Sequence, residues 1–206
     1  MKTGQIVAVA TILGICAAAA QAQIGVDVAL SGAGVFSKTV TSSTSSISDS
    51  PTKSVAVLGT VRYHFKPRHA VEVNFGHTKN SQIFTVPPDT FRVMTGISEF
   101  TGAYVFTPFA SEKWQPFLLA GGGGLRFSVG NTYIDTIPGS FGTAGQTSLA
   151  FLYGVGTDYR IWSHLGLRLQ YRGLVYRNPD FGVASRFYTG AKSHMAEPAL
   201  GIVVKF

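Results

Sequence analysis

The chain has 206 residues and a formal net charge of +7, and it contains 24 glycines and one cysteine. Its length suits a single domain. The basic balance suggests a nucleic-acid partner, but no basic helix and no cluster of Lys and Arg is present, so we expect no nucleic-acid binding. After the first 22 residues no segment holds 18 or more apolar residues, so we expect no transmembrane helix in the remainder.

The first 22 residues have the pattern of an export signal. Lys2 is their only charge, Ile6 to Ala20 is apolar, and Ala20-Gln21-Ala22 has the small residues that a signal peptidase recognises. A retained membrane helix would need about 20 apolar residues. Lipidation at Cys16 is disfavoured because Ile15 stands where a small residue is required. We predict a cleaved signal peptide at 1–22 and a mature domain at 23–206, with a charge of +6 after loss of Lys2 and with no cysteine for a disulfide.

The mature domain reads as a series of strands, because apolar and polar residues alternate with period 2 and no long 3.6-residue pattern appears. Eight is the smallest common strand number of bacterial membrane barrels. We therefore predict an all-β fold, an eight-stranded antiparallel up-and-down transmembrane β-barrel. The eight predicted strands are Gly25–Lys38, Ser54–Phe65, Ala70–Thr78, Val93–Phe106, Gln115–Phe127, Thr147–Arg160, Leu165–Tyr176 and His194–Phe206.

The predicted connections alternate in length. Long polar loops are expected at 39–53, 79–92, 128–146 and 177–193, and short turns at 66–69, 107–114 and 161–164. Outer-membrane barrels have short periplasmic turns and long extracellular loops. The alternation therefore favours a membrane barrel over a soluble sandwich.

Each predicted strand has an apolar face and a face with nearly all the ionisable residues. An eight-stranded barrel has an interior only just filled by side chains, so we expect the apolar face to meet lipid, with Val57, Leu119 and Leu167 against acyl chains. The inward face would then carry small residues, namely Gly122, Gly124, Gly154, Gly156 and Gly166. Aromatic girdles are expected from Phe65, Phe106, Phe117, Tyr159 and Phe206 at the periplasmic rim and Phe36, Phe75, Phe127 and Phe151 at the outer rim.

The inward face is predicted to hold an ionic network with five residues of each sign. Buried charges are costly unless paired, so matched signs favour a structural core over the alternative, an ion or proton path. The predicted members are Asp27, Arg62, Glu72, Glu99, Arg126, Asp158, Arg160, Arg168, Arg172 and Glu197.

The final strand, Pro198–Phe206, ends on an aromatic residue, and two other segments are Gly154-Val-Gly-Thr-Asp-Tyr-Arg and Gly166-Leu-Arg-Leu-Gln-Tyr-Arg. With the segment that begins at Trp114-Gln-Pro-Phe, these features resemble the small eight-stranded outer-membrane barrels, the family of the OmpA transmembrane domain and the OmpX-like proteins. The resemblance implies residence in the bacterial outer membrane, contact with its lipids and lipopolysaccharide, and insertion by periplasmic chaperones and the assembly machinery. It also implies that Phe206 is the assembly signal.

Motifs with catalytic chemistry are weak. Gly121–Gly124 lacks the following Lys-Ser/Thr of a phosphate loop and lies inside a strand. His77-Thr-Lys-Asn-Ser81 departs from the His-x-Ser-Asn pattern of lipid A deacylases because Lys79 occupies the Ser position. The histidines lack metal-ligand spacing. We expect no enzyme activity, no metal and no cofactor.

The preferred interpretation is a monomeric barrel that serves envelope structure or binds a surface ligand through four extracellular loops. Aromatic loop residues offer contact points for such a ligand. One alternative is a narrow porin-like channel, and another is a lipid A-modifying enzyme. The aromatic loop residues are Tyr133, Phe141, Phe181, Phe187 and Tyr188.

Overall fold

The computed structural model describes residues 25–42, 46–140 and 142–206. The predicted signal peptide and Phe141 lie outside these residues. Eight long strands form one antiparallel sheet in which β1 pairs with both β4 and β11, and β5 pairs with both β4 and β6, so the sheet closes. The predicted fold class is confirmed. The long strands are β1 (Gly25–Ser37), β4 (Ser54–Lys66), β5 (His69–Val86), β6 (Asp89–Phe106), β7 (Trp114–Ile134), β9 (Gln146–Arg160), β10 (Leu165–Arg177) and β11 (Lys192–Lys205).

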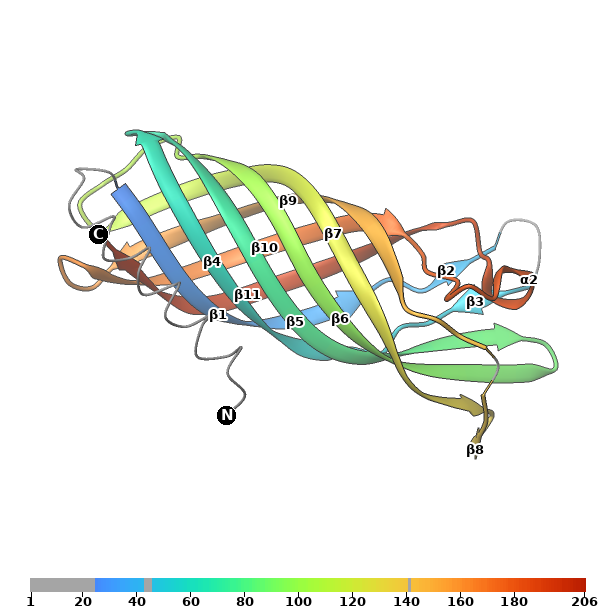
Figure 1. Ribbon diagram of the computed structural model, residues 1–206. Helices are drawn as coiled ribbons and strands as arrows, with labels where there is room; N and C mark the ends of the chain where they lie inside the picture. The colour runs from blue at the N-terminus through green and yellow to red at the C-terminus, as the bar shows by residue number, and fades with distance from the viewer. Residues whose placement is uncertain (1–24, 43–45, 141) are drawn as a thin grey trace, which may run out of the picture.

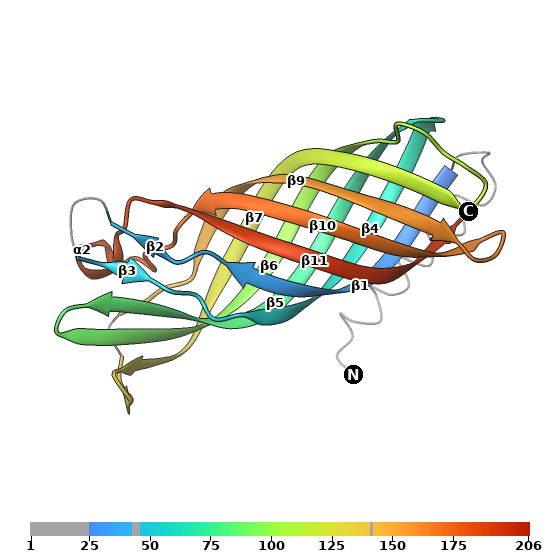
Figure 2. The same ribbon diagram turned by 180° about the vertical axis from the view of Figure 1, so that it is seen from behind.

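The two ends of the barrel differ (Figure 1). The short connections and the C-terminus lie at one end, here called the periplasmic end, and the opposite view agrees (Figure 2). At the other end β5, β6 and β7 extend beyond the barrel, beside the short elements β2 (Val40–Thr41), β3 (Ser48–Asp49), β8 (Ile137–Pro138) and α2 (Ala184–Phe187). Within the described residues no helix is long and apolar enough to cross a membrane.

The prediction of a loop at 79–92 is wrong. β5 and β6 pair residue by residue up to Val86 and Asp89, so this segment is a long hairpin. Asn80, Gln82 and Phe84 alternate as buried residues along β5, which continues the period-2 pattern of the barrel strands. The polar composition of the segment concealed that pattern.

The outer wall is apolar on most strands. Leu30, Val57, Phe75, Leu149 and Leu169 are all exposed on it. A face of this kind suits the lipid contact that a membrane barrel needs. Paired rings add to it, because the centroids of Phe75 and Phe100 lie 4.9 Å apart and those of Trp114 and Tyr159 lie 4.8 Å apart.

The predicted orientation is wrong for β7. Phe117 and Leu119 are buried in the lumen together with Leu125 and Phe127, whereas Val57 and Leu167 are exposed as expected. Glycines on the next strand provide the space. A Cβ on Gly156 would lie 2.4 Å from the Phe117 ring, and one on Gly154 would lie 3.3 Å from a Leu119 methyl group. Bulky side chains from one strand therefore fit where the neighbouring strand has none.

The glycine run of β7 follows the same reversed alternation. Gly124 lies opposite Phe100, which is exposed, so Gly122 and Gly124 are on the outer face and the prediction for them is wrong. Gly121 and Gly123 alternate with them, and a Cβ on Gly123 would lie 2.1 Å from the carbonyl oxygen of Phe100. No side chain fits at that distance, so β7 can lie this close to β6 only with glycine.

Candidate functional site

The periplasmic half of the lumen holds an ionic group, here called the inner cluster: Asp27, Arg62, Glu72, Asp158 and Arg168. Arg62 and Glu72 are direct cross-strand partners on β4 and β5, and Arg168 and Asp158 are partners on β10 and β9. The Arg62 Nε and Nη2 atoms donate to Glu72 Oε2 at 3.0 and 2.9 Å. Arg168 donates from Nε and Nη2 to the two oxygens of Asp158 at 2.7 and 2.9 Å. All five side chains are buried.

An aromatic ring lies close to both arginines of the inner cluster. The Phe117 ring centroid lies 4.1 Å from Arg62 Cζ and 5.3 Å from Arg168 Cζ. A guanidinium over an aromatic face gains electrostatic attraction, most of all where water is excluded. Phe117 thus attracts both cations and offsets part of the repulsion between them.

Two further basic side chains contact the inner cluster from the periplasmic side. His64 Nε2 lies 2.8 Å from Asp27 Oδ2, and Lys205 Nζ lies 3.3 Å from Asp158 Oδ2. Lys205 also hydrogen-bonds Gln115. His64 and Lys205 were not predicted to belong to the network. The one signal in the sequence was the position of Lys205, a charged residue in the final strand directly before Phe206.

A second ionic group, the middle cluster, lies in the lumen and consists of Glu99, Arg172 and Glu197. Arg172 and Glu197 are cross-strand partners on β10 and β11. Arg172 Nη2 lies 3.3 Å from Glu197 Oε2 and also pairs with Glu99. The Arg172 side chain is fully buried.

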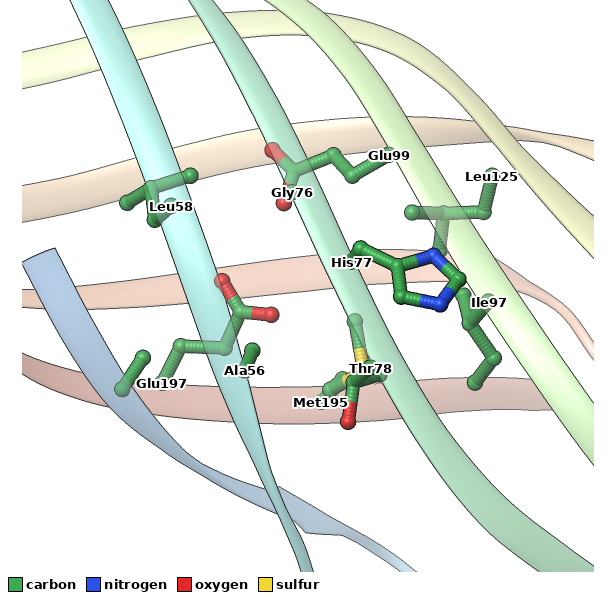
Figure 3. Close-up of a pocket in the computed structure, with 11 residues that line it drawn as sticks. Ala56, Leu58, Gly76, His77, Thr78, Ile97, Glu99, Leu125, Met195 and Glu197 are labelled. Carbon is green, nitrogen blue, oxygen red and sulfur yellow. The ribbon is translucent and has the colours of Figure 1, made fainter. Parts of the chain in front are cut away.

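Apolar side chains fill the lumen between the middle cluster and the outer mouth of the barrel. Figure 3 shows Glu99 and Glu197 beside Leu58, Leu125 and Met195, around a cavity of about 10 Å³. This volume is close to the smallest that holds one water molecule. Residues nearer the outer mouth, such as Leu152, Leu174, Val93 and Phe127, are also fully buried. We call Leu58, Ile97, Leu125, Leu152, Leu174 and Met195 the apolar layer.

The extracellular segments pack together above the apolar layer into a unit here called the cap: residues 40–42 and 46–50, the β5–β6 hairpin from Ser81 to Val93, and residues 178–191. Its core is aromatic. The Phe84 and Phe187 rings stack at 4.4 Å, Phe91 meets Phe187 edge-on at 5.4 Å, and Phe181 meets Phe84 edge-on at 6.0 Å. Phe84, Phe181 and Phe187 are fully buried.

One buried carboxyl group joins two parts of the cap. Asn178 Nδ2 donates to Asp49 Oδ2 at 3.0 Å, which links the first extracellular segment to the last. Asp49 has no exposed surface and no cation among its described contacts. Burial raises the pKa of Asp49 from 3.8 to about 7, and the hydrogen bonds from Asn178 and Ile83 oppose that rise.

The structure brings together eight of the ten residues predicted for the ionic network, in the inner and middle clusters. The prediction is wrong for Arg126 and Arg160, which are exposed. Arg126 lies on β7, where the faces are reversed, and Arg160 is the last residue of β9 at the periplasmic end. The prediction that Phe181 and Phe187 contact a loop ligand is also wrong, because both side chains are buried inside the cap.

The described residues offer little for catalysis or metal binding. His77 Nδ1 lies 3.2 Å from Ser98 Oγ, both residues are exposed, and among the described residues no carboxylate forms a hydrogen bond or ion pair with either side chain. Ser81 is not the hydroxyl next to His77. Within the described ranges no three His, Cys, Asp or Glu side chains gather in a way that could hold a metal ion.

A closed eight-stranded antiparallel barrel with an apolar outer wall defines the class of small outer-membrane β-barrels. The family model described as the outer membrane protein beta-barrel domain matches residues 6–190, and the chain belongs to this family. The protein is therefore a bacterial outer-membrane protein, in contact with the lipids and lipopolysaccharide of that membrane. The comparison with curated proteins found no match.

Three solved structures share the fold. Neisserial surface protein A is 17% identical, with a TM-score of 0.52 over 90% of this chain and 98% of that one. Ail of Yersinia pestis, solved with the heparin analogue sucrose octasulfate, is 14% identical, with a TM-score of 0.54 over 90% and 100%. OprG of Pseudomonas aeruginosa is 12% identical, with a TM-score of 0.55 over 88% and 95%.

Proposed function

We propose that this protein is a closed, non-conducting and non-enzymatic barrel that acts at the cell surface, where its cap binds an external anionic partner. The observation that carries the proposal is the aromatic core of the cap. Loops that guard an open pore have no need of a packed core, whereas a binding surface gains from preorganisation because less entropy is lost when the partner binds. A purely structural role in the envelope is the simpler hypothesis, but such a role does not require a preorganised binding surface on the cap.

Charge supports an anionic partner. Among the described residues that are not buried, six basic and three acidic side chains lie at or beyond the outer ends of the strands. The basic residues are Lys38, Lys53, Arg92, Arg177, Arg186 and Lys192, and the acidic ones are Asp89, Asp135 and Asp180. Tyr188, which is 51% exposed, adds an aromatic contact. The related fold of Ail was solved with a sulfated heparin analogue, which makes a sulfated polysaccharide the first ligand to test.

The channel alternative is less well supported. The inner cluster pairs its charges tightly, and the apolar layer continues the obstruction toward the outer mouth. A constriction lined by apolar side chains excludes water and ions. The alternative of a lipid A-modifying enzyme is weakened because no carboxylate of the described residues bonds to His77 and orients it toward a serine nucleophile.

Heparin affinity chromatography of the folded barrel in nonionic detergent tests the proposal. We expect retention at low salt, and earlier elution of the double variant Arg92→Gln, Arg186→Gln, because polyanion binding depends on the number of cations engaged. The matched control is Lys66→Gln, Arg68→Gln, two exposed charges at the periplasmic end. Absence of retention, or equal elution of both variants, would contradict a cationic surface on the cap. Mass spectrometry of lipid A from cells with and without the gene tests the enzyme alternative.

A further inference from the structure

A polar patch lies at the outer end of the apolar wall on β5, β6 and β7. Two cross-strand rows form it, one with His77 opposite Ser98 opposite Arg126, and the next with Lys79 opposite Gly96 opposite Ser128. All but Gly96 are exposed, and Gly96 is half-buried. We call these six residues the wall patch.

The wall patch lies where the apolar wall ends. The exposed residues Phe75 and Phe100, whose ring centroids are 4.9 Å apart, lie one step nearer the periplasm on the same strands. A membrane strand needs about 9–11 residues to cross the hydrocarbon. Counting that many from His69, the first residue of β5, reaches the segment His77–Lys79. The patch is therefore at the level where acyl chains give way to head groups.

The centre of the wall patch is a hollow over Gly96. A Cβ at this position would have His77 Cε1 at 3.8 Å and Ser128 Cβ at 4.0 Å as its nearest neighbours. The imidazole forms one side of the hollow, and its contact with Ser98 at 3.2 Å holds it there. A shallow groove lined by Lys79, Gly96 and Ser128 continues from the hollow toward the outer mouth.

The charge of the patch is not balanced by the protein. Among the described residues neither Lys79 nor Arg126 has an ion-pair partner. The carboxylates of the same strands are elsewhere, because Glu72 and Glu99 are buried in the lumen and Asp89 is at the tip of the hairpin. Two unpaired cations beside serine hydroxyls form a donor set for a phosphate group, which accepts several hydrogen bonds at once.

We infer that the wall patch binds the phosphate group of an outer-leaflet lipid, with the phosphate over Gly96 and the acyl chains along Phe75 and Phe100. Arg126 offers a planar fork of donors and Lys79 a point charge. The site binds and carries out no reaction. It lies on the membrane-facing wall and is independent of the proposed function of the cap.

Native mass spectrometry in nonionic micelles tests the inference, with added bisphosphorylated lipid A as the probe. We expect the folded protein to retain one lipid, and the double variant Lys79→Gln, Arg126→Gln to retain it at least about tenfold more weakly because two charge-assisted contacts are lost. Gly96→Val fills the hollow without a change of charge and should also weaken retention. The matched control, Lys66→Gln, Arg68→Gln, removes two exposed charges at the periplasmic end and should retain the lipid as the unchanged protein does.

Folding of each variant is verified by heat-modifiable gel mobility. Equal retention by Lys79→Gln, Arg126→Gln and the control would overturn the site. Equal retention of a dephosphorylated lipid would show that acyl contacts suffice, and would overturn phosphate recognition. Displacement of the lipid by equimolar inorganic phosphate would overturn the lipid as ligand, since the anion alone would then bind as well.

Discussion

Replacement of Arg168 by Met should strongly destabilise the folded barrel. Arg168 is fully buried and donates two charge-assisted hydrogen bonds, of 2.7 and 2.9 Å, to the carboxylate of Asp158. Among the described residues, its removal leaves Asp158 with Lys205 at 3.3 Å and Arg62 at 3.8 Å as ion-pair partners. Removing one partner of a buried pair costs about 3–5 kcal/mol, and here Asp158 loses both of its hydrogen bonds from Arg168 while Asp27 loses the same cation at 3.9 Å. Loss of the cation–π contact with Phe117, at 5.3 Å from Cζ to the ring centroid, adds to the effect.

The assay is urea unfolding in phospholipid vesicles, monitored by tryptophan fluorescence. The matched control is Arg160→Met, at an exposed position on β9, which should change the free energy of unfolding by no more than about 0.5 kcal/mol. The double variant Arg168→Met, Asp158→Leu should recover much of the loss, since replacing both partners by apolar residues is often nearly neutral. A cost below about 1 kcal/mol for Arg168→Met would refute the reasoning.

Three further predictions concern the cap and β7. First, the pKa of Asp49 is raised to about 7 in the folded protein, so the folded state holds a proton that the unfolded state releases near pH 3.8. Docking of the cap should therefore weaken as pH rises from about 3.8 to about 7. Faster hydrogen exchange of residues 177–191 at the higher pH, after correction for the intrinsic exchange rate, would show this weakening. Asp49→Asn should abolish that pH dependence. Second, Phe187→Ala should destabilise the cap by about 3–5 kcal/mol, whereas Tyr188→Ala, at an exposed position, should change little in the same exchange measurement. Third, Gly123→Ala should prevent folding in a gel-mobility assay while Gly124→Ala folds, because their Cβ atoms would lie 2.1 and 3.7 Å from the nearest atoms; equal folding would contradict the close approach of β7.

The strand pattern alone was sufficient to predict the closed barrel and most of its ionic core. Arg62, Glu72, Asp158 and Arg168 lie on strands where polar and apolar faces alternate regularly, and the register makes cross-strand partners of them. The sequence could not reveal the pairing itself, since register depends on contacts between strands distant in the chain.

β7 shows where the pattern was insufficient. The sequence of β7 is compatible with its apolar face pointing either to lipid or to the lumen. The face points to the lumen because β9 leaves space there: Gly154 makes room for Leu119 and Gly156 makes room for Phe117. Periodicity within one strand carries no information on the volume opposite it. The cap was missed for a similar reason, because Phe84 and Phe187 are 103 positions apart and meet only in the folded chain.

Single-channel recording in planar bilayers tests the central claim, a barrel closed by its inner cluster, apolar layer and cap. We expect no channel openings from the folded protein at moderate voltage in about 1 M salt, where the Debye length is about 3 Å, while a porin recorded in parallel conducts. Regular openings that scale with the amount of inserted protein would contradict the account, because ions would then pass Arg168, Arg172 and Leu125, all fully buried in this structure.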